Sequence, residues 1–391
     1  MPTDDHQLQM IDLASRALGG SVVTANDESF GEKENLILPT AADFTPGSFG
    51  HKGEIVDGWE TRRRRTPGHD WALIRLGSPG VIHSIDVDTS FFTGNYPETC
   101  RVEACGVEGY PSPEELAAPD VGWEEIVPLS PLEGDTHNQF TVTTPTRFTH
   151  VRLSIHPDGG VARLRVNGRV IPDPRRFHGL TLDLAAQENG GVVEVSSDTF
   201  YSSAGVLNLP GLARHMGDGW ETRRRRGTGN DWAIISLAAP GRLRRIEVDT
   251  SYYVNNASGE CALFGAASET TPEPDSPLWF PLLSRARLQP DTRHFFDVAG
   301  TEAVTHVRFD AFPDGGISRL RLFGTVDSAA WPALALRWFN TLPADQAQFV
   351  LTRTAGFDPG AAQILTARRP LAHGDRAIDA IPGLCAEGES T

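Results

Sequence analysis

The densest group of reactive side chains is a nine-residue block that occurs twice. Residues 57–65 read DGWETRRRR, and residues 218–226 repeat the same nine letters. Arginine presents a planar fork that binds carboxylates and ureido oxygens in a bidentate manner, so part of each block is suited to holding a small anion. The alternative is an internal ion-pair network with the nearby carboxylates. In the first copy these are Asp57, Glu60, Asp70 and Asp88.

The block predicts an extended strand whose side chains alternate between two faces. One face would carry Asp57, Trp59, Thr61, Arg63 and Arg65, and the other Glu60, Arg62 and Arg64. Both faces of such a strand would present arginine.

A possible proton-transfer group follows the first block. Residues 69–71 read HDW, whereas residues 230–232 read NDW, so the histidine belongs only to the first copy. A histidine beside a carboxylate can donate or accept a proton near neutral pH, although a lone histidine is more often structural. The two tryptophans head alternating apolar segments, and we expect both in the core.

Further candidates lie where strands end. Asp88 and Asp249 are the second residues of the repeated motif VDTS, at the ends of predicted strands, and Asn95 lies in the loop after the first of them. Carboxylates at strand ends are frequent ligand or metal positions, and they are also ordinary turn caps. The PDGG motif at residues 157–160 and 313–316 predicts a tight turn, and Arg152, on the strand before the first of these turns, can reach an anion.

The chemistry that these groups favour is acid/base hydrolysis of a small polar anion. The sequence has no nucleophile elbow, Walker loop, Rossmann glycine pattern or HExxH motif. A formal charge of −16 argues against nucleic-acid and anionic-membrane partners. The first twenty residues lack a basic start followed by an apolar run, and no segment is apolar enough to span a bilayer, so we expect a soluble, cytoplasmic protein.

The sequence segments that should position these groups occur twice in the chain. Residues 70–80 (DWALIRLGSPG) match 231–241, and residues 149–168 (THVRLSIHPDGGVARLRVNG) match 305–324, so each unit has about 160 residues and is a domain. Short alternating segments such as WALIRL and VIHSIDVDTSFF, bounded by turn residues, predict antiparallel strands.

We therefore expect an all-β protein of two tandem jelly-roll β-sandwich domains, galactose-binding-like in type, with a short α-helical C-terminal tail. The expected divisions are an N-terminal segment (1–19), a first repeat (20–172), a second repeat (178–326) and the tail (331–391).

With these blocks in place, the chain resembles the allantoicases over about residues 20–325. The resemblance rests on DGWETRRRR with GHDW, LGSPG, VDTSFFTGNYPE and HVRLSIHPDGGVARLRVNG. It implies hydrolysis of allantoate to ureidoglycolate and urea, a homo-oligomer, and room for a divalent metal such as manganese, with no cofactor certain. The second unit departs from the pattern, since YYVNNASGE replaces the loop FFTGNYPE and Asn230 replaces His69.

The substrate that the resemblance implies assigns roles to the candidates. Arg62, Arg63 or both would hold the carboxylate, Glu60 or His69 would move protons, and Asp88 and Asn95 would hold the ureido arms. The expected catalytic residues are Glu60, His69, Asp70 and Asp88. The expected substrate-binding residues are Asp57, Trp59, Arg62, Arg63, Asn95, Arg152, Asp218, Glu221, Arg223, Arg224 and Asp249.

The tail carries a second resemblance. Residues 339–356 and 367–383 look like the opening of OHCU decarboxylase, which acts on the hydroxy-ureidoimidazoline intermediate of urate degradation, but Phe-Asp-Pro replaces the expected His-Ser-Pro. We expect a remnant without decarboxylase activity. Two other hypotheses for the function of the whole chain stay open. One is a non-catalytic tandem β-sandwich ligand-binding protein, and the other is an architectural repeat whose ion pairs join domains or subunits.

Overall fold

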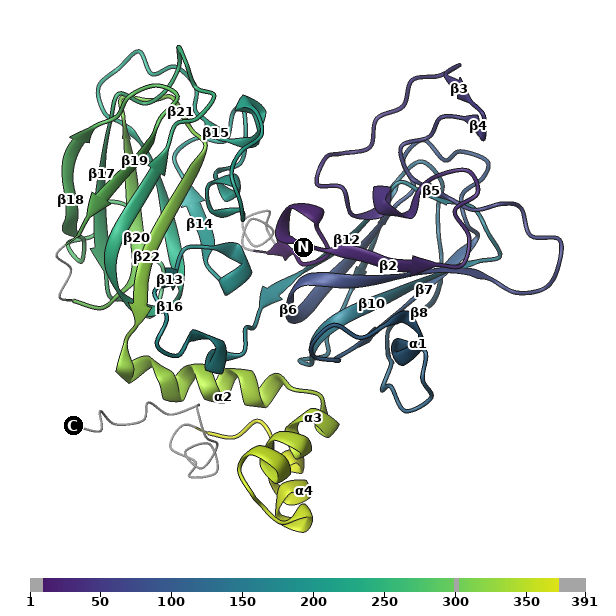
Figure 1. Cartoon of the computed structure of the whole chain (residues 1–391). Coiled ribbons are helices and arrows are strands. Elements are labelled where there is room, and N and C mark those ends of the chain that lie inside the picture. The colour runs from purple at the N-terminus through teal and green to yellow at the C-terminus, as the bar shows by residue number, and fades with distance from the viewer. Residues whose placement is uncertain (1–9, 299–301, 373–391) are drawn as a thin grey trace. The chain divides into compact units, whose positions relative to one another are not determined.

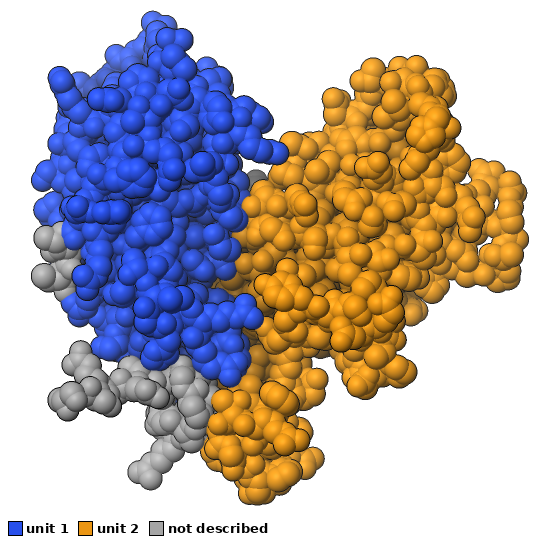
Figure 2. All heavy atoms as spheres, viewed as in Figure 1, with its two compact units in different colours: residues 1–10, 172–338, 371–391 blue, residues 11–171, 339–370 orange. Residues whose placement is uncertain are grey.

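The computed structural model describes residues 10–298 and 302–372 (Figure 1). They form two compact units: one holds residues 11–171 and 339–370, and the other is built around residues 172–338 (Figure 2). Each unit contains one eight-stranded antiparallel sheet bent into a sandwich, and the helices gather at the C-terminal end of the chain. The predicted all-β architecture of two tandem sandwiches with a short helical tail is confirmed.

The first repeat, residues 11–170, has the strand order β1-β12-β6-β10-β7-β8, and β2 and β9 also pair with β6. Its larger strands are β2 (Ser21–Ala25), β6 (Asp70–Asp88), β7 (Thr99–Cys105), β8 (Glu124–Pro131), β9 (His137–Thr141), β10 (Arg147–His156) and β12 (Arg163–Val170). Its two-residue strands are β1 (Ile11–Asp12), β3 (Phe49–Gly50), β4 (Gly53–Glu54), β5 (Trp59–Glu60) and β11 (Gly160–Val161), and its helix is α1 (Pro113–Leu116). Since β1 pairs with β12, the sheet begins at Ile11.

The second repeat, residues 182–326, has the equivalent order β13-β22-β16-β20-β17-β18, with β14 and β19 on β16. Its strands are β13 (Leu182–Asp183), β14 (Val192–Ser196), β15 (Trp220–Glu221), β16 (Asp231–Asp249), β17 (Glu260–Ala266), β18 (Phe280–Arg287), β19 (Arg293–Asp297), β20 (Val304–Phe312), β21 (Gly316–Ile317) and β22 (Arg319–Val326). Single-turn 3-10 helices at Lys33–Ile37 and Ala204–Asn208 occupy equivalent places in the two repeats.

One long strand joins the two layers of each sandwich. The segments WALIRL and VIHSIDVDTSFF were expected as separate strands, but residues 71–76 and 81–88 of them belong to one strand, β6. Its residues 70–75 pair with β10 and its residues 84–88 pair with β9, and the β10 register skips residues 76–79 between them. Pro79 and Gly80 bend the strand at this corner without ending it. A Cβ on Gly80 would lie 2.4 Å from the Arg169 carbonyl oxygen, so the corner requires glycine.

The core of each repeat is built from the inward-facing residues of its strands. Ile74, Ile85 and Val87 of β6 are fully buried, as are Ile246 and Val248 of β16. Alternation of apolar and polar residues along these strands places the apolar side chains in the core.

The tail consists of short helices, α2 (Trp331–Thr341), α3 (Ala344–Phe349), a π-helical turn (Val350–Thr354) and α4 (Pro359–Ala367). Residues 339–370 belong to the same compact unit as the first repeat, and the Gln346 side chain donates to the Gly106 carbonyl oxygen at 2.6 Å. Asp358 of the Phe-Asp-Pro segment caps α4. The decarboxylase-like residues 373–383 lie outside the described residues. No described helix is long and apolar enough to cross a membrane.

Candidate active site

The first repeated block frames a hollow of about 460 Å³ at one end of the first repeat. The two-residue strand β5 pairs with β11, so that Glu60 lies opposite Gly160. The PDGG turn packs against the loop that contains Asn95, and a Cβ on Gly159 would lie 2.6 Å from the Asn95 carbonyl oxygen. This turn therefore needs glycine, and it fixes Glu60 and Asn95 beside each other. The lining residues are Phe30, Glu60, Thr61, Arg63, Arg65, Gly94, Asn95, Tyr96, Glu98, Pro157, Asp158 and Gly159.

Glu60 and Asn95 form the polar centre of this Glu60 hollow. The Asn95 side-chain amide donates to Glu60 Oε1 at 2.7 Å. Burial raises the pKa of the Glu60 carboxyl above its usual range, and the hydrogen bond from Asn95 partly offsets this effect. A carboxyl group with a raised pKa in a hollow is suited to give and take a proton near neutral pH.

The chain leaves the sheet after Glu60, so the strand predicted over the whole block covers only Trp59 and Glu60. Arg63 and Arg65 still lie on one side and line the hollow, but Glu60 lines it with them, so the predicted placement of Glu60 on the opposite face is wrong. Within residues 10–298 and 302–372, neither guanidinium has an ion-pair partner. Arg62 is exposed and lies 3.2 Å from Asp27, while Arg64 pairs with Asp70 at 2.5 Å.

Three of the candidates belong to the supporting framework around the hollow. Trp59 is fully buried, and its Nε1 donates to the Asp27 carbonyl oxygen at 2.8 Å. Asp70 is buried beside Arg64. Asp57 accepts a 2.6 Å hydrogen bond from the buried Arg163.

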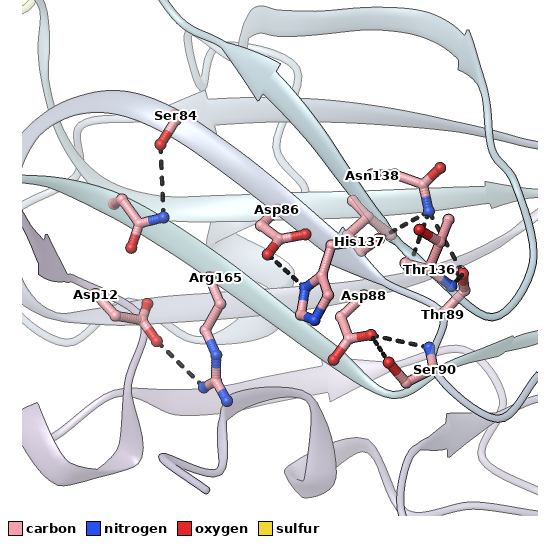
Figure 3. Close-up of polar contacts among 12 residues, drawn as sticks. Asp12, Ser84, Asp86, Asp88, Thr89, Ser90, Thr136, His137, Asn138 and Arg165 are labelled. Carbon is pink, nitrogen blue, oxygen red and sulfur yellow. Dashed lines mark hydrogen bonds and ion pairs between the residues drawn. The ribbon is translucent and has the colours of Figure 1, made fainter. Parts of the chain in front are cut away.

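Asp88 lies at the end of β6, outside the residues that line the hollow. Its Oδ1 accepts hydrogen bonds from the Ser90 backbone N–H at 2.8 Å and from the Ser90 hydroxyl at 2.6 Å, as Figure 3 shows. Asp249 makes the same cap with the Ser251 N–H at 2.8 Å. On the same outer face, His137 contacts Asp86 at 2.8 Å (Figure 3).

His69 and Arg152 line a different hollow, of about 330 Å³, over the outer face of β6 and β10. The rings of His69 and His156 stack with their centroids 4.5 Å apart. Burial, together with the charges of His69 and Arg101, lowers the pKa of His156. Arg152 is held by Glu103 at 2.8 Å. Trp71 also lines this His69 hollow and is half-buried, so the expectation that it lies in the core is wrong.

The second repeat reproduces the polar centre. Asn256 donates to Glu221 Oε1 at 2.7 Å, the same distance as in the first repeat. Asp218 pairs with Arg214 at 3.0 Å, and Arg223 lies over the Phe200 ring at 4.4 Å. Arg224, like its counterpart Arg63, is exposed.

Arg65, Tyr96, Glu98 and Asp158 line the Glu60 hollow although they were not among the candidates. Asp158 belongs to the PDGG motif, whose presence in both repeats was a usable signal for a role beyond a turn. Its carboxylate accepts the Arg64 backbone N–H at 2.7 Å, so it also fixes the arginine block. Tyr96 and Glu98 lie in the loop at which the two repeats differ in sequence, and that difference was a signal that could have found them.

The described residues offer no group of three or more histidine, cysteine, aspartate or glutamate side chains arranged to hold a metal ion. Cys100 and Cys261 are buried, and burial raises the pKa of each thiol to about 12. The raised pKa of Glu60 and its hydrogen bond with Asn95 make acid/base chemistry the reaction type that the hollow supports best.

Comparisons with known proteins all point to one family. A family model, the allantoicase repeat, matches residues 11–171 and 182–327. The chain is 50% identical over 340 residues to a probable allantoicase of Streptomyces coelicolor, which covers 84% of this chain and 89% of the relative. A probable allantoicase of Nocardia farcinica is 50% identical over 318 residues, covering 81% and 94%. The crystal structure of allantoicase from Saccharomyces cerevisiae is 34% identical with a TM-score of 0.70, covering 81% and 93%. The chain belongs to the allantoicase family.

Proposed function

We propose that this protein hydrolyses allantoate to ureidoglycolate and urea, with the Glu60 hollow as an active site. The similarity to probable allantoicases at 50% identity carries the proposal, and the polar lining of the hollow supports it. Allantoate has one carboxylate and two ureido groups on a single carbon. Arg63 and Arg65 supply unpaired positive charge for the carboxylate, and Asn95 and Asp158 supply polar groups for the ureido arms.

Glu60 is the proton-transfer group in this proposal. In its protonated form it gives its proton to the ureido nitrogen as the bond from that nitrogen to the central carbon breaks. The oxygen of a water molecule bonds to the same carbon, and the proton that this water loses returns to Glu60. The products are one urea and one ureidoglycolate, and the carboxyl group is regenerated.

The other candidates have supporting roles. The supporting framework includes Asp57, Trp59, Asp70 and Asp88. The His69 hollow, which is separate from the Glu60 hollow, contains His69 and Arg152. We further propose a cytoplasmic homo-oligomer, in keeping with the family resemblance.

The test is to incubate the purified protein with allantoate and to quantify urea and ureidoglycolate over time, with and without a chelator. Equal rates of release of both products would support the proposal, and loss of activity with chelator would return a metal to the mechanism. A folded protein that binds allantoate without turnover would instead be a tandem ligand-binding protein. His69→Ala should retain most activity, since its hollow is separate from that of Glu60.

A further inference from the structure

The first repeat carries an insertion beside the Glu60 hollow. In both repeats a 3-10 helix ends just before a leucine, Leu38 or Leu209, and the block begins at Asp57 or Asp218. Eighteen residues (39–56) join these points in the first repeat, and eight (210–217) join them in the second. The additional residues form the hairpin of β3 and β4, which projects at the end of the repeat where β5 lies (Figure 1).

The hairpin holds large apolar side chains in water. Phe49 is 71% exposed and Ile55 is 57% exposed. Gly53 of the hairpin lies against the ring of Phe30, which itself lines the Glu60 hollow and is 44% exposed. Exposed apolar side chains gain stability when they leave water, and Phe30, whose ring lies beside Gly53, offers an apolar surface on which these can be buried.

The base of the insertion is fixed, whereas its tip is bonded only to itself. The buried Arg163 donates to the Thr40 carbonyl oxygen at 2.9 Å, and the Asp43 N–H donates to Asp57 at 3.0 Å. Beyond these anchors, the described hydrogen bonds of residues 45–55 stay within the hairpin, for example from the Gly47 N–H to Glu54 at 2.9 Å. Such a segment can rotate as a unit about its base without losing its internal bonds.

We propose that the β3–β4 hairpin is a lid of the first repeat, which closes over the Glu60 hollow when substrate is bound. Closure places Phe49 and Ile55 against Phe30 and excludes water from the hollow. Exclusion of water strengthens the interactions of Arg63 and Arg65 with the substrate carboxylate. This inference rests on the proposed function, because the occupant of the closed hollow is allantoate.

The sequence offers a direct probe of the lid. It contains only two lysines, Lys33 and Lys52. Lys52 is exposed between β3 and β4, whereas Lys33 is 19% exposed and pairs with Glu34 at 2.8 Å. Endoproteinase Lys-C should therefore cut the open form after Lys52, and Lys52→Arg identifies that cut. Cleavage after Lys33 serves as an internal reference for general unfolding.

The experiment is a short digestion of the intact protein with and without saturating allantoate, alongside a turnover assay. Allantoate should slow cleavage after Lys52 at least about fivefold, since a saturating ligand that favours the closed state shifts most of the population to it. Turnover with equal cleavage in both conditions would overturn the lid and leave the proposed function intact. Absence of turnover would overturn both.

The variant Phe49→Ser tests the contact that closes the lid. The matched control is Leu212→Ser, in the shorter equivalent segment of the second repeat, because Leu212 is also an exposed apolar residue, at 56%. Phe49→Ser should lower kcat/KM about three- to tenfold and remove the protection of Lys52, with the melting temperature unchanged. Leu212→Ser should change neither quantity. Dissociation of an oligomer by Phe49→Ser would assign the hairpin to contact with a second copy and would contradict the lid.

Discussion

The two repeats share one framework and differ at the edges of their hollows. In both, a buried tryptophan precedes a glutamate that accepts a 2.7 Å hydrogen bond from an asparagine, as Glu60 does from Asn95 and Glu221 from Asn256. The differences lie in loops: Ala257 and Gly259 replace Tyr96 and Glu98, and the hairpin insertion is confined to the first repeat.

This comparison distinguishes the residues that maintain the β-sandwich from the residues that form the candidate site. Loops on a rigid framework tolerate change and carry function, so a duplicated domain can keep its polar centre while one copy loses part of the surrounding wall. We therefore expect the first repeat to dominate catalysis. Paired substitutions at equivalent positions measure this asymmetry.

The largest difference is expected in the free energy of unfolding, between the variants Arg163→Ala and Arg319→Ala. Arg163 is fully buried and reaches the Thr40 carbonyl oxygen and both the carbonyl and the carboxylate of Asp57, whereas Arg319 reaches the carbonyl oxygens of Asp218 and Ser318. Arg163→Ala leaves more polar groups without a partner than Arg319→Ala does. It should therefore lower the free energy of unfolding by about 3 kcal/mol, and Arg319→Ala should lower it by less. Urea unfolding followed by circular dichroism measures both, and equal losses would contradict the expected asymmetry.

The next effect concerns turnover. Glu60→Gln should lower kcat for allantoate about 100-fold, the usual scale for loss of an acid/base group, whereas Glu221→Gln should stay within about threefold of the parent protein. Urea release under saturating substrate gives kcat, and circular dichroism checks folding. Similar losses in the two variants would mean that both repeats catalyse.

The pH profile should respond to Asn95 and not to Asn256. The hydrogen bond from Asn95 lowers the pKa of Glu60 against the larger effect of burial, so Asn95→Ala raises that pKa further. The limb of the kcat/KM profile that reports Glu60 then moves to higher pH. Asn256→Ala should leave the profile in place, and a shift of the Asn95→Ala limb toward lower pH would remove Glu60 as the titrating group.

The smallest expected effect is on the pH dependence of stability, and it comes from one ion pair. His137 faces Asp86 in the first repeat, where Arg293 faces Glu247 in the second. The hydrogen bond to Asp86 raises the pKa of His137, so the pair stabilises the fold fully below the ordinary histidine pKa of 6.5 and loses this contribution as pH rises through the higher folded value. Because His137 is 60% exposed, the loss should be no more than about 0.5 kcal/mol.

His137→Arg should remove this pH dependence, and Arg293→His should introduce it in the second repeat. Unfolding free energies between pH 6 and pH 9 are the measurement. A dependence that persists in His137→Arg must come from another group.

The sequence predicted the architecture because duplication and alternation are local signals. The repeat, the antiparallel strands and the helical tail could all be read from spacing. The continuity of β6 through Pro79 and Gly80 could not, because a Pro-Gly pair usually marks a turn and only tertiary pairing keeps this one within a strand.

The candidate site was only partly predictable. Glu60, Arg63 and Asn95 meet in one hollow, as the block and the adjoining loop suggested. His69 follows the block closely in sequence but lines another hollow, because Asp70 begins β6 and carries the chain to a different face. Nearness along the chain predicts nearness in space only while the chain stays in one element.

The bent strand β6 also has a consequence for native-state fluctuations. Its residues 70–75 and 84–88 pair in different parts of the sheet, yet they belong to one continuous strand. Neither layer can detach without breaking the ladder bonds of the other. Backbone amides in the two halves of β6 should therefore exchange with deuterium through the same global opening, which makes each repeat a single cooperative unit.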